Sequence, residues 1–285
     1  MIKKNVVVIP IYKNFSILEK SELQSLNRCL EILSKHPIVF FGPSDIFWSD
    51  YENHAKNSFN VFVRIELFNN DFFKNVNGYN KLLLSSSFYK RFNNYDYMLI
   101  YQLDAWVFRD ELDFWCNKNY HYIGAPWFDG YHIQNQNEKF IGVGNGGFSL
   151  RNIKKSFSVL RKVNILKKTV VKKNVIILSK LSFLVKLFCF VFKFRKDIFL
   201  EIYNNNLTAK EFLSFEENED IFWGLKVPML FCDYKVPEPQ IALKFSFETN
   251  PSYLYHLNNN NLPFGCHAWL KYNPDFYKKF INIET

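Results

Sequence analysis

The chain has 285 residues, 48% of them hydrophobic, and includes 32 Phe and 16 Tyr. This length suffices for one large α/β domain or two small ones, and the aromatic content excludes an intrinsically disordered chain. The net charge of +9 is unevenly spread, because residues 154–196 hold 13 of the 36 basic residues and no acidic one, which leaves a mildly acidic remainder.

The cysteines and the N-terminus both indicate a cytoplasmic protein. The five cysteines are scattered and lack C-x-x-C spacing, a pattern that disfavours a zinc site or a disulfide framework and fits a reducing compartment. The apolar run from Val6 to Ile11 has six residues, whereas the core of a signal peptide needs about seven or more. We therefore expect this run to form the first β-strand.

Strand and helix patterns alternate over the first 150 residues. Runs rich in β-branched and aromatic residues predict strands over 6–12, 37–42, 61–68 and 95–108, and from residue 121 onward. Helical spacing of apolar residues predicts helices over 21–36, with Ser21 as the N-cap, and over 78–92. This alternation predicts a single α/β domain over 1–285 with a mixed, mostly parallel sheet flanked by helices. Ligands of such sheets bind at the carboxyl ends of the strands.

Residues 152–212 form a predicted basic, apolar helical insertion within this domain. Its lysines and arginines recur in clusters over 152–200, and no run of about 18 uncharged apolar residues occurs, so a membrane span is disfavoured. Two interpretations remain open. The segment is either a basic amphipathic surface lying on an anionic membrane or a helical pair packed on the domain with its lysines in water. Nucleic acid is not the expected partner, because the insertion is apolar between its lysines.

Two motifs in the first half of the chain carry candidate chemistry. Asp104 lies at the end of the apolar run in YQLDAWVF (101–108), where a carboxylate needs a partner, which is either a metal ion or ribose, or a turn that it caps. Four of the ten glycines lie in GVGNGG (142–147), followed directly by FSLR. Glycines let the backbone approach a ligand closely, and a Gly-Gly pair before a helix turns free N–H groups toward an anion. The alternative is a tight strand-to-helix turn.

Two further motifs follow in the second half. In FEENEDIFWG (215–224), Asp220 directly precedes an apolar run, and it is either a general base for an acceptor hydroxyl or part of a charged helix N-terminus. In PFGCHAW (263–269), His267 lies beside glycine and aromatic residues. It is either a ligand-binding residue or a structural histidine.

Taken in order, LDAWVF, GNGGFSLR, NEDIFW and GCHAW resemble the motifs of GT-A glycosyltransferases. More closely, YQLDAWVF, IGAPW, GNGGFSLR and EDIFWG resemble a bacterial family of uncharacterised, glycosyltransferase-like proteins of the DUF5672 type. The resemblance implies a GT-A (Rossmann-like) fold. It also implies an enzyme that moves a sugar from a nucleotide-sugar donor to a hydroxyl of a surface polysaccharide or a lipid-linked glycan, such as a capsule or lipopolysaccharide, at the inner face of the cell membrane. The alternative is a catalytically inactive module that binds a glycan or a nucleotide.

The resemblance also implies roles for individual residues. Asp220 would deprotonate the acceptor in an inverting reaction, with retention left open, and Glu219 would bind the acceptor or serve as the base. The implied donor-binding residues are Pro10, Tyr12, Tyr79, Asn80, Lys81, Gln102, Asp104, Asn145, Gly146 and Gly147. His267 would bind a metal ion or the diphosphate.

The D-x-D motif of the family is incomplete here and aligns in two ways. Gln102-Leu103-Asp104 keeps the second Asp, which is the usual metal ligand, whereas Asp104-Ala105-Trp106 keeps only the first. The Val-Phe that follows favours the second alignment. Dependence on Mn²⁺ or Mg²⁺, bound by Asp104 and His267, is therefore left open against neutralisation of the diphosphate by cationic side chains or backbone N–H groups.

Overall fold

The structure is a computed structural model that describes residues 4–129, 139–171, 190–195 and 218–282. Its main sheet has six strands in the order β3 (Val63–Leu67), β2 (Ile38–Gly42), β1 (Asn5–Pro10), β4 (Tyr97–Tyr101), β9 (Phe148–Asn152) and β6 (Tyr122–Ile123). The first four are parallel to one another, and β9 is antiparallel to both of its neighbours. The predicted mixed, mostly parallel sheet is confirmed.

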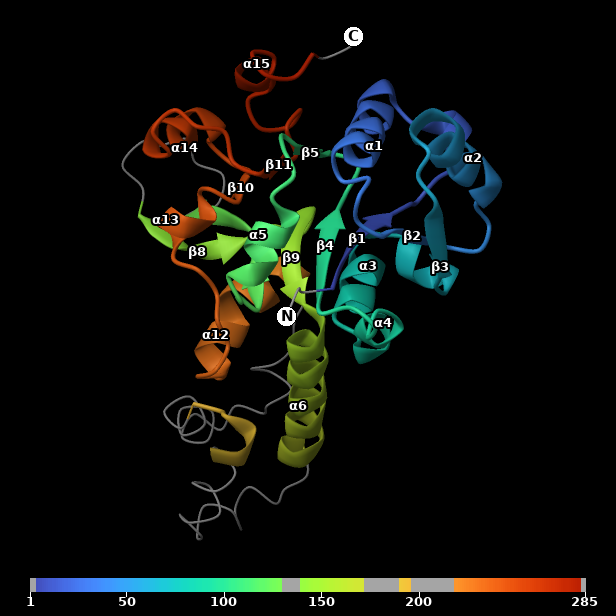
Figure 1. Ribbon diagram of the computed structural model, residues 1–285. Coiled ribbons are helices and arrows are strands. Elements are labelled where there is room, and N and C mark those ends of the chain that lie inside the picture. Colours follow the sequence, from blue (N-terminus) through green and yellow to red (C-terminus); the bar gives the residue numbers. More distant parts are fainter. Residues whose placement is uncertain (1–3, 130–138, 172–189, 196–217, 283–285) are drawn as a thin grey trace, which may run out of the picture.

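The parallel strands at the centre of this sheet are buried throughout. Every residue of β1, β2 and β4 is buried, which explains why these strands appear in the sequence as continuous apolar runs rather than alternating ones. Helices flank the sheet (Figure 1). Those of the first half of the chain are α1 (Lys20–Ile32), α2 (Trp48–Phe59), α3 (Val76–Leu83), α4 (Ser86–Arg91) and α5 (Leu112–Asn117), with short 3-10 turns η1 (Phe15–Ile17) and η2 (Asn70–Phe73).

A smaller unit, built from the C-terminal part of the chain and three strands from its middle, lies beside the main sheet (Figure 1). It contains the three-stranded sheet β10 (Ser246–Phe247), β11 (Gly265–His267) and β5 (Ala105–Val107), and the hairpin of β7 (Ala125–Phe128) with β8 (Phe140–Gly144). Its helices are α13 (Pro239–Ala242), α14 (Pro251–Leu257) and α15 (Pro274–Tyr277). A second apolar cluster forms here, with Phe247, Leu254, Trp269 and Tyr277 buried within it.

The acidic motif begins a helix that changes geometry after its first turn. It starts as α11 (Glu219–Ile221), passes through the π-helical turn η3 (Phe222–Lys226) and ends as α12 (Val227–Leu230). Within the π turn, a Cβ on Gly224 would overlap the carbonyl oxygen of Val143. This glycine therefore lets the helix lie directly against β8.

Three local predictions are corrected by the structure. Glu19, not Ser21, is the N-cap of α1, because the Glu19 and Glu22 side chains each accept the other's backbone N–H in a capping box. The helix predicted over 78–92 is two helices, since α3 ends at Leu83 and the Ser85 hydroxyl caps α4 by accepting from the Phe88 N–H at 3.2 Å. The strand predicted over 95–108 is broken at Gln102–Asp104, where the chain leaves the main sheet and enters the smaller one.

The first part of the basic insertion is the helix α6 (Ile153–Val171), which extends away from the end of β9 (Figure 1). It packs on the domain through buried Val159 and Val163. Lys154 pairs with Asp96 at 3.1 Å, and Lys155 pairs with Asp233 at 2.7 Å. The start of the insertion is thus packed on the domain, while 172–189 and 196–217 lie outside the described residues and the predicted membrane contact stays a prediction. In the described part of the chain, no helix has both the length and the apolar character needed to cross a bilayer.

Candidate active site

A cavity of about 760 Å³ lies at the edge of the main sheet where β1 and β4 end. Because β9 runs antiparallel to β4, its first residue, Phe148, pairs with the last residue of β4, Tyr101. The Gln102 N–H donates to the Gly147 carbonyl oxygen at 2.8 Å. The turn that carries Asp104 and the glycine motif are therefore joined at the same edge of the sheet, as expected for a ligand site of an α/β protein.

The glycine motif allows the other motifs to converge on this cavity. A Cβ on Gly147 would collide with the His267 ring and would lie 2.9 Å from the Gln102 side-chain oxygen. A Cβ on Gly146 would lie 3.4 Å from Glu219 Oε1 and 3.5 Å from Asp220 Oδ2. Close approach of the His267 ring, rather than positive φ, therefore explains Gly147, whereas a Cβ on Gly146 would make only ordinary contacts.

The prediction that Gly146 and Gly147 precede a helix is wrong. Phe148–Asn152 is the strand β9, held by β4 on one side and β6 on the other, and the helix begins only at Ile153. Nor is the Gly147 N–H free for an anion, since it donates to the Asn145 side-chain oxygen at 2.9 Å. The sheet satisfies the backbone groups that the predicted helix start would have left open.

Most of the implied donor-binding residues line the cavity. Those that do are Tyr12, Tyr79, Asn80, Gln102, Asp104, Gly146 and Gly147. The remaining three do not. Pro10 is buried at the end of β1, and Lys81 is exposed elsewhere on α3. Asn145 is fully buried, and its side-chain oxygen accepts from the N–H groups of Gly147 and Phe148 at 2.9 Å each, so it shapes the glycine turn.

An aromatic wall forms one side of the cavity. Tyr12 lies after β1, Phe73 ends η2 and Tyr79 belongs to α3. The ring of Tyr12 meets that of Tyr79 edge to face at 5.7 Å and that of Phe73 at 6.1 Å. Such a wall suits a flat, partly apolar group such as a nucleobase.

The acidic motif places two carboxylates at the cavity, in different environments. Glu219 is 2% exposed, and both of its oxygens accept from Arg151, at 2.7 and 2.8 Å. Asp220 follows it, and its Oδ1 accepts from the Ile221 N–H at 2.9 Å. Burial, and then the charges of Glu219 and Glu248, raise the pKa of Asp220 to about 7. A general base with such a pKa is matched to work near neutral pH.

A chain of contacts links four residues on the opposite side. The Trp127 indole N–H donates to Glu248 Oε2 at 2.9 Å, and the His267 Nδ1 lies 2.9 Å from Glu248 Oε1. The His267 Nε2 is 3.2 Å from Asp104 Oδ1, although it lacks the geometry of a hydrogen bond.

These contacts shift the pKa values of His267 and Asp104. Burial lowers the pKa of His267, but the carboxylates of Asp104 and Glu248 outweigh it and raise that pKa to about 10. Burial raises the pKa of Asp104, but His267 outweighs it and holds that pKa below its usual value.

Asp104 and His267 have the spacing of two metal ligands, and the metal ion implied by the resemblance would have to displace the proton of His267 to bind there. Two ligands of one octahedral Mg²⁺-like ion lie about 3 Å apart, close to the 3.2 Å between His267 Nε2 and Asp104 Oδ1. The buried Nε2 has no hydrogen-bond partner, and the carboxylate of Glu248 on Nδ1 is the usual support of a ligating histidine. Among the described residues, no group of three or more His, Cys, Asp or Glu side chains could hold a metal ion. Further ligands would have to come from a bound diphosphate and water.

Sequence reasoning missed several residues that line the cavity. They are Phe73, Val76, Trp127, Glu248, Thr249, Lys271 and Tyr272. Glu248 has no motif around it, and only the pairing of β10 with β11 brings it to His267. The Thr249 hydroxyl is buried without a hydrogen-bond partner. Lys271 lies in the turn that follows β11, two residues beyond the motif at 263–269 that the sequence analysis singled out.

The structure is therefore an α/β protein whose acidic, aromatic-walled cavity at the strand ends is a candidate small-molecule site. Residues 62–267 match the model of the family described as "Protein of unknown function (DUF5672)". Since this match covers more than half of the chain, the protein belongs to that family. A comparison with curated protein sequences gives no match.

Solved structures resemble the chain at low identity. Core-mannan synthase A from Aspergillus fumigatus, in its Mn/GDP form, is 10% identical, with a TM-score of 0.33 over 53% of this chain and 60% of its own. The glycosyltransferase GlyE of Streptococcus pneumoniae is 17% identical, with a TM-score of 0.46 over 93% of this chain and 54% of its own. Mouse xyloside xylosyltransferase 1, in its apo form, is 8% identical, with a TM-score of 0.42 over 92% of this chain and 97% of its own.

Proposed function

We propose that this protein is a glycosyltransferase that moves a sugar from a nucleotide-sugar donor to a hydroxyl of a glycan or lipid-linked acceptor. The proposal rests on one observation, which is that a carboxylate, an Asp–His pair and a group of aromatic rings line the same cavity. Asp220 supplies a carboxylate with a raised pKa, the paired Asp104 and His267 line the same cavity, and Tyr12, Phe73 and Tyr79 supply an aromatic wall. Each group has a counterpart in the chemistry of sugar transfer from a nucleoside diphosphate.

The donor would lie along the strand ends. The nucleobase would pack on the wall of Tyr12 and Tyr79, and the diphosphate would lie near the cationic side chains of His267 and Lys271. A Mn²⁺ or Mg²⁺, when bound, would displace the His267 proton and be held by Asp104 and the neutral imidazole, and it would neutralise charge on the departing diphosphate. Gly146, which lies beside Glu219 and Asp220, would leave room for the sugar.

Asp220 would act on the acceptor. Its carboxylate would accept the proton of the acceptor hydroxyl, whose oxygen then forms a bond to the anomeric carbon of the donor sugar. The bond from that carbon to the diphosphate breaks, and its electron pair leaves with the diphosphate oxygen. Attack from the side opposite the diphosphate inverts the anomeric carbon. Glu219 is not assigned a second base role, since both of its oxygens are bound to Arg151.

The acceptor and the location of the enzyme are proposed from composition. With 13 basic and no acidic residues in 154–196, the insertion has the charge to contact an anionic membrane surface from the cytoplasmic side. Such a contact would hold the enzyme at the membrane, where a lipid-linked acceptor resides.

A donor screen tests the proposal. Purified protein is incubated with a panel of nucleotide sugars, with and without Mn²⁺ or Mg²⁺, and both thermal stability and released nucleotide are measured. One donor should raise the melting temperature and release its nucleotide slowly.

The incomplete D-x-D motif favours a second candidate, an inactive module that binds a glycan or nucleotide. Stabilisation by a nucleotide without turnover, even with acceptors, would support that module instead.

A further inference from the structure

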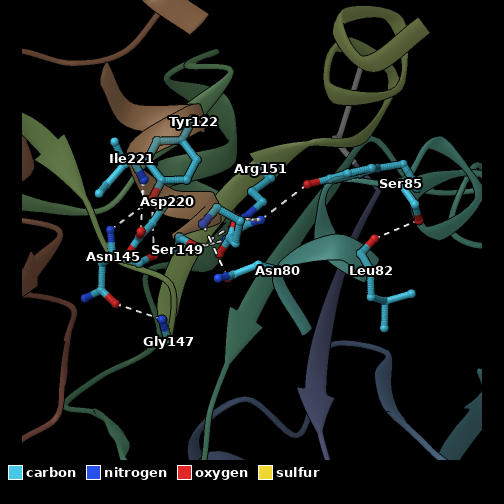
Figure 2. A network of polar contacts seen from close by, with 12 residues as sticks. Asn80, Leu82, Ser85, Tyr122, Asn145, Gly147, Ser149, Arg151, Asp220 and Ile221 are labelled. Atoms are coloured by element: carbon cyan, nitrogen blue, oxygen red, sulfur yellow. Dashed lines mark hydrogen bonds and ion pairs between the residues drawn. The ribbon is translucent and has the colours of Figure 1, made fainter. Parts of the chain in front are cut away.

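We propose that Glu219, held by Arg151, is a positioning residue that fixes the orientation of Asp220 and the charge beside it. This inference rests on the proposed function only where it treats Asp220 as a base. Figure 2 shows the surrounding polar network, in which Arg151 of β9, Asn80 of α3 and Asp220 of α11 come together.

The pair is buried and fully engaged. Arg151 has no exposed surface, and its two terminal nitrogens donate to the two oxygens of Glu219 at 2.7 and 2.8 Å. The remaining donors of the guanidinium reach the Ser149 hydroxyl, at 3.0 and 3.2 Å, and the Tyr89 hydroxyl at 3.3 Å. Protonation of Glu219 would remove the negative charge that strengthens both bonds and would leave the buried Arg151 cation uncompensated. Its geometry is that of a fixed anion.

The backbone at the start of α11 is held as well. The Asn80 side-chain oxygen accepts from the Glu219 N–H at 3.3 Å, and its amide group donates to the Asn218 side-chain oxygen at 3.2 Å. The helix start is therefore attached to β9 through a side chain and to α3 through the backbone. Asp220 is the next residue, so its Cα is fixed relative to Gly146. This assigns Asn80, which was predicted to bind the donor, a second task in supporting α11.

A purely structural role explains this pair poorly. A buried ion pair contributes little stability compared with apolar residues of the same volume, because both charges lose their hydration. This pair stands one residue from the candidate base. The groups that act on the charge of Asp220 are Glu219 on its own helix, Arg151 on β9, Glu248 after β10 and the Tyr122 hydroxyl on β6.

Those groups act in opposite directions on Asp220. Burial raises its pKa most, Glu219 and Glu248 raise it further, and Arg151 lowers it. Replacing Glu219 with Gln keeps the shape of the side chain, removes one negative neighbour and leaves the Arg151 charge uncompensated. Both changes lower the pKa of Asp220, so the direction is unambiguous.

The test follows the titration of Asp220 directly, by NMR of protein labelled with ¹³C at the Asp carboxyl carbons, beside the pH dependence of turnover. In Glu219→Gln the Asp220 midpoint should move down by roughly one pH unit or more, and the midpoint of kcat should move with it. Asp110→Asn is the control, because it breaks the partly buried pair with His36 away from the cavity. It should leave both midpoints in place.

The outcomes separate this inference from the proposed function. A folded Glu219→Gln protein whose Asp220 midpoint is unchanged overturns the inference, whether or not the wild type turns over a donor. If Glu219→Gln does not fold, Arg151→Lys decides, because lysine keeps the charge but loses the forked geometry. Its turnover should fall at least about tenfold and the Asp220 carboxyl signal should shift, since Asp220 is no longer held in one orientation. An unchanged signal and unchanged turnover in that variant also overturn the inference.

Discussion

Nε2 of His267 lies 3.2 Å from Oδ1 of Asp104, across the antiparallel pairing of β11 with β5. On its other side, the His267 ring is held through Nδ1 by Glu248. The two strands are about 160 residues apart in the chain but neighbours in the three-stranded sheet, so the contact brings the turn after β4 to the C-terminal part of the chain. Whatever binds in the cavity meets a carboxylate and an imidazole in a fixed relation.

Asp104→Asn should weaken donor binding in a metal-dependent way. The substitution keeps the shape of the side chain but removes its charge, and with it the better of the two metal ligands. We expect the donor-induced rise in melting temperature seen with Mn²⁺ to fall, while the rise without metal changes little. Calorimetric titration of the donor with and without Mn²⁺ checks this. Equal losses under both conditions would show that Asp104 contacts the donor itself.

Turnover should rise with pH through the pKa of Asp220. A general base works only when deprotonated, so with a pKa of about 7 kcat should climb between pH 6 and 8 and then level. Asp220→Asn should lower kcat by about 10²–10⁴-fold and abolish this rise. Initial rates measured across the pH range for the wild type and for Asp220→Asn test both expectations. A variant that retains wild-type kcat would remove Asp220 from the mechanism.

The same pKa predicts that Asp220→Asn stabilises the fold. The folded-state pKa of about 7 lies above the ordinary value of 3.8, so ionisation opposes folding and stability falls as pH rises from about 4 to 7. The variant should be equally stable at pH 4 and more stable by roughly 2–4 kcal/mol at pH 8. Urea unfolding at both pH values tests this.

Asp110→Asn is the matched control, with the opposite sign. Burial raises the Asp110 pKa, but the hydrogen bonds from His36 and Lys35 outweigh it and bring that pKa to about 2. Asp110 therefore contributes stability above pH 4 that is lost as pH falls toward 2. Its Asn variant should be destabilised at pH 8. If both variants changed stability in the same direction, the assigned environments would be wrong.

Gly147→Ala should disable the site by a steric route. The added methyl group would meet the His267 ring and the Gln102 side chain, so His267 must move away from Asp104. We expect a loss of about 1–3 kcal/mol in the free energy of unfolding and a larger proportional loss of donor binding. Gly146→Ala is the milder comparison, since its nearest contact is 3.4 Å. Equal effects at the two positions would contradict the packing described for them.

The sequence predicted the parts of the fold that depend on local pattern. The continuous apolar runs of β1, β2 and β4 predicted a parallel sheet. Asp104 and Asp220 were predicted as site residues because each is a carboxylate beside an apolar run. The helix predicted after Gly147 failed because pairing with β4 and β6 holds Phe148–Asn152 as a strand, and no local signal encodes that pairing.

The partners of the site residues were not predictable in the same way. Glu248 meets His267 only because β10 pairs with β11. Arg151 and Glu219 are 68 positions apart and meet through the packing of α11 beside β9. Each residue type was visible in the sequence, but its neighbour was set by tertiary structure.

The most direct test compares nucleotide release by the wild type and by Asp220→Asn at pH 8, using the donor that stabilises the wild type most. An acceptor glycan is present, and the product is analysed for a new glycosidic bond. The account predicts a transferred sugar and released nucleotide with the wild type, and a loss of at least about 10²-fold in the variant with donor binding retained. Donor binding by both proteins with transfer by neither would contradict the enzyme assignment.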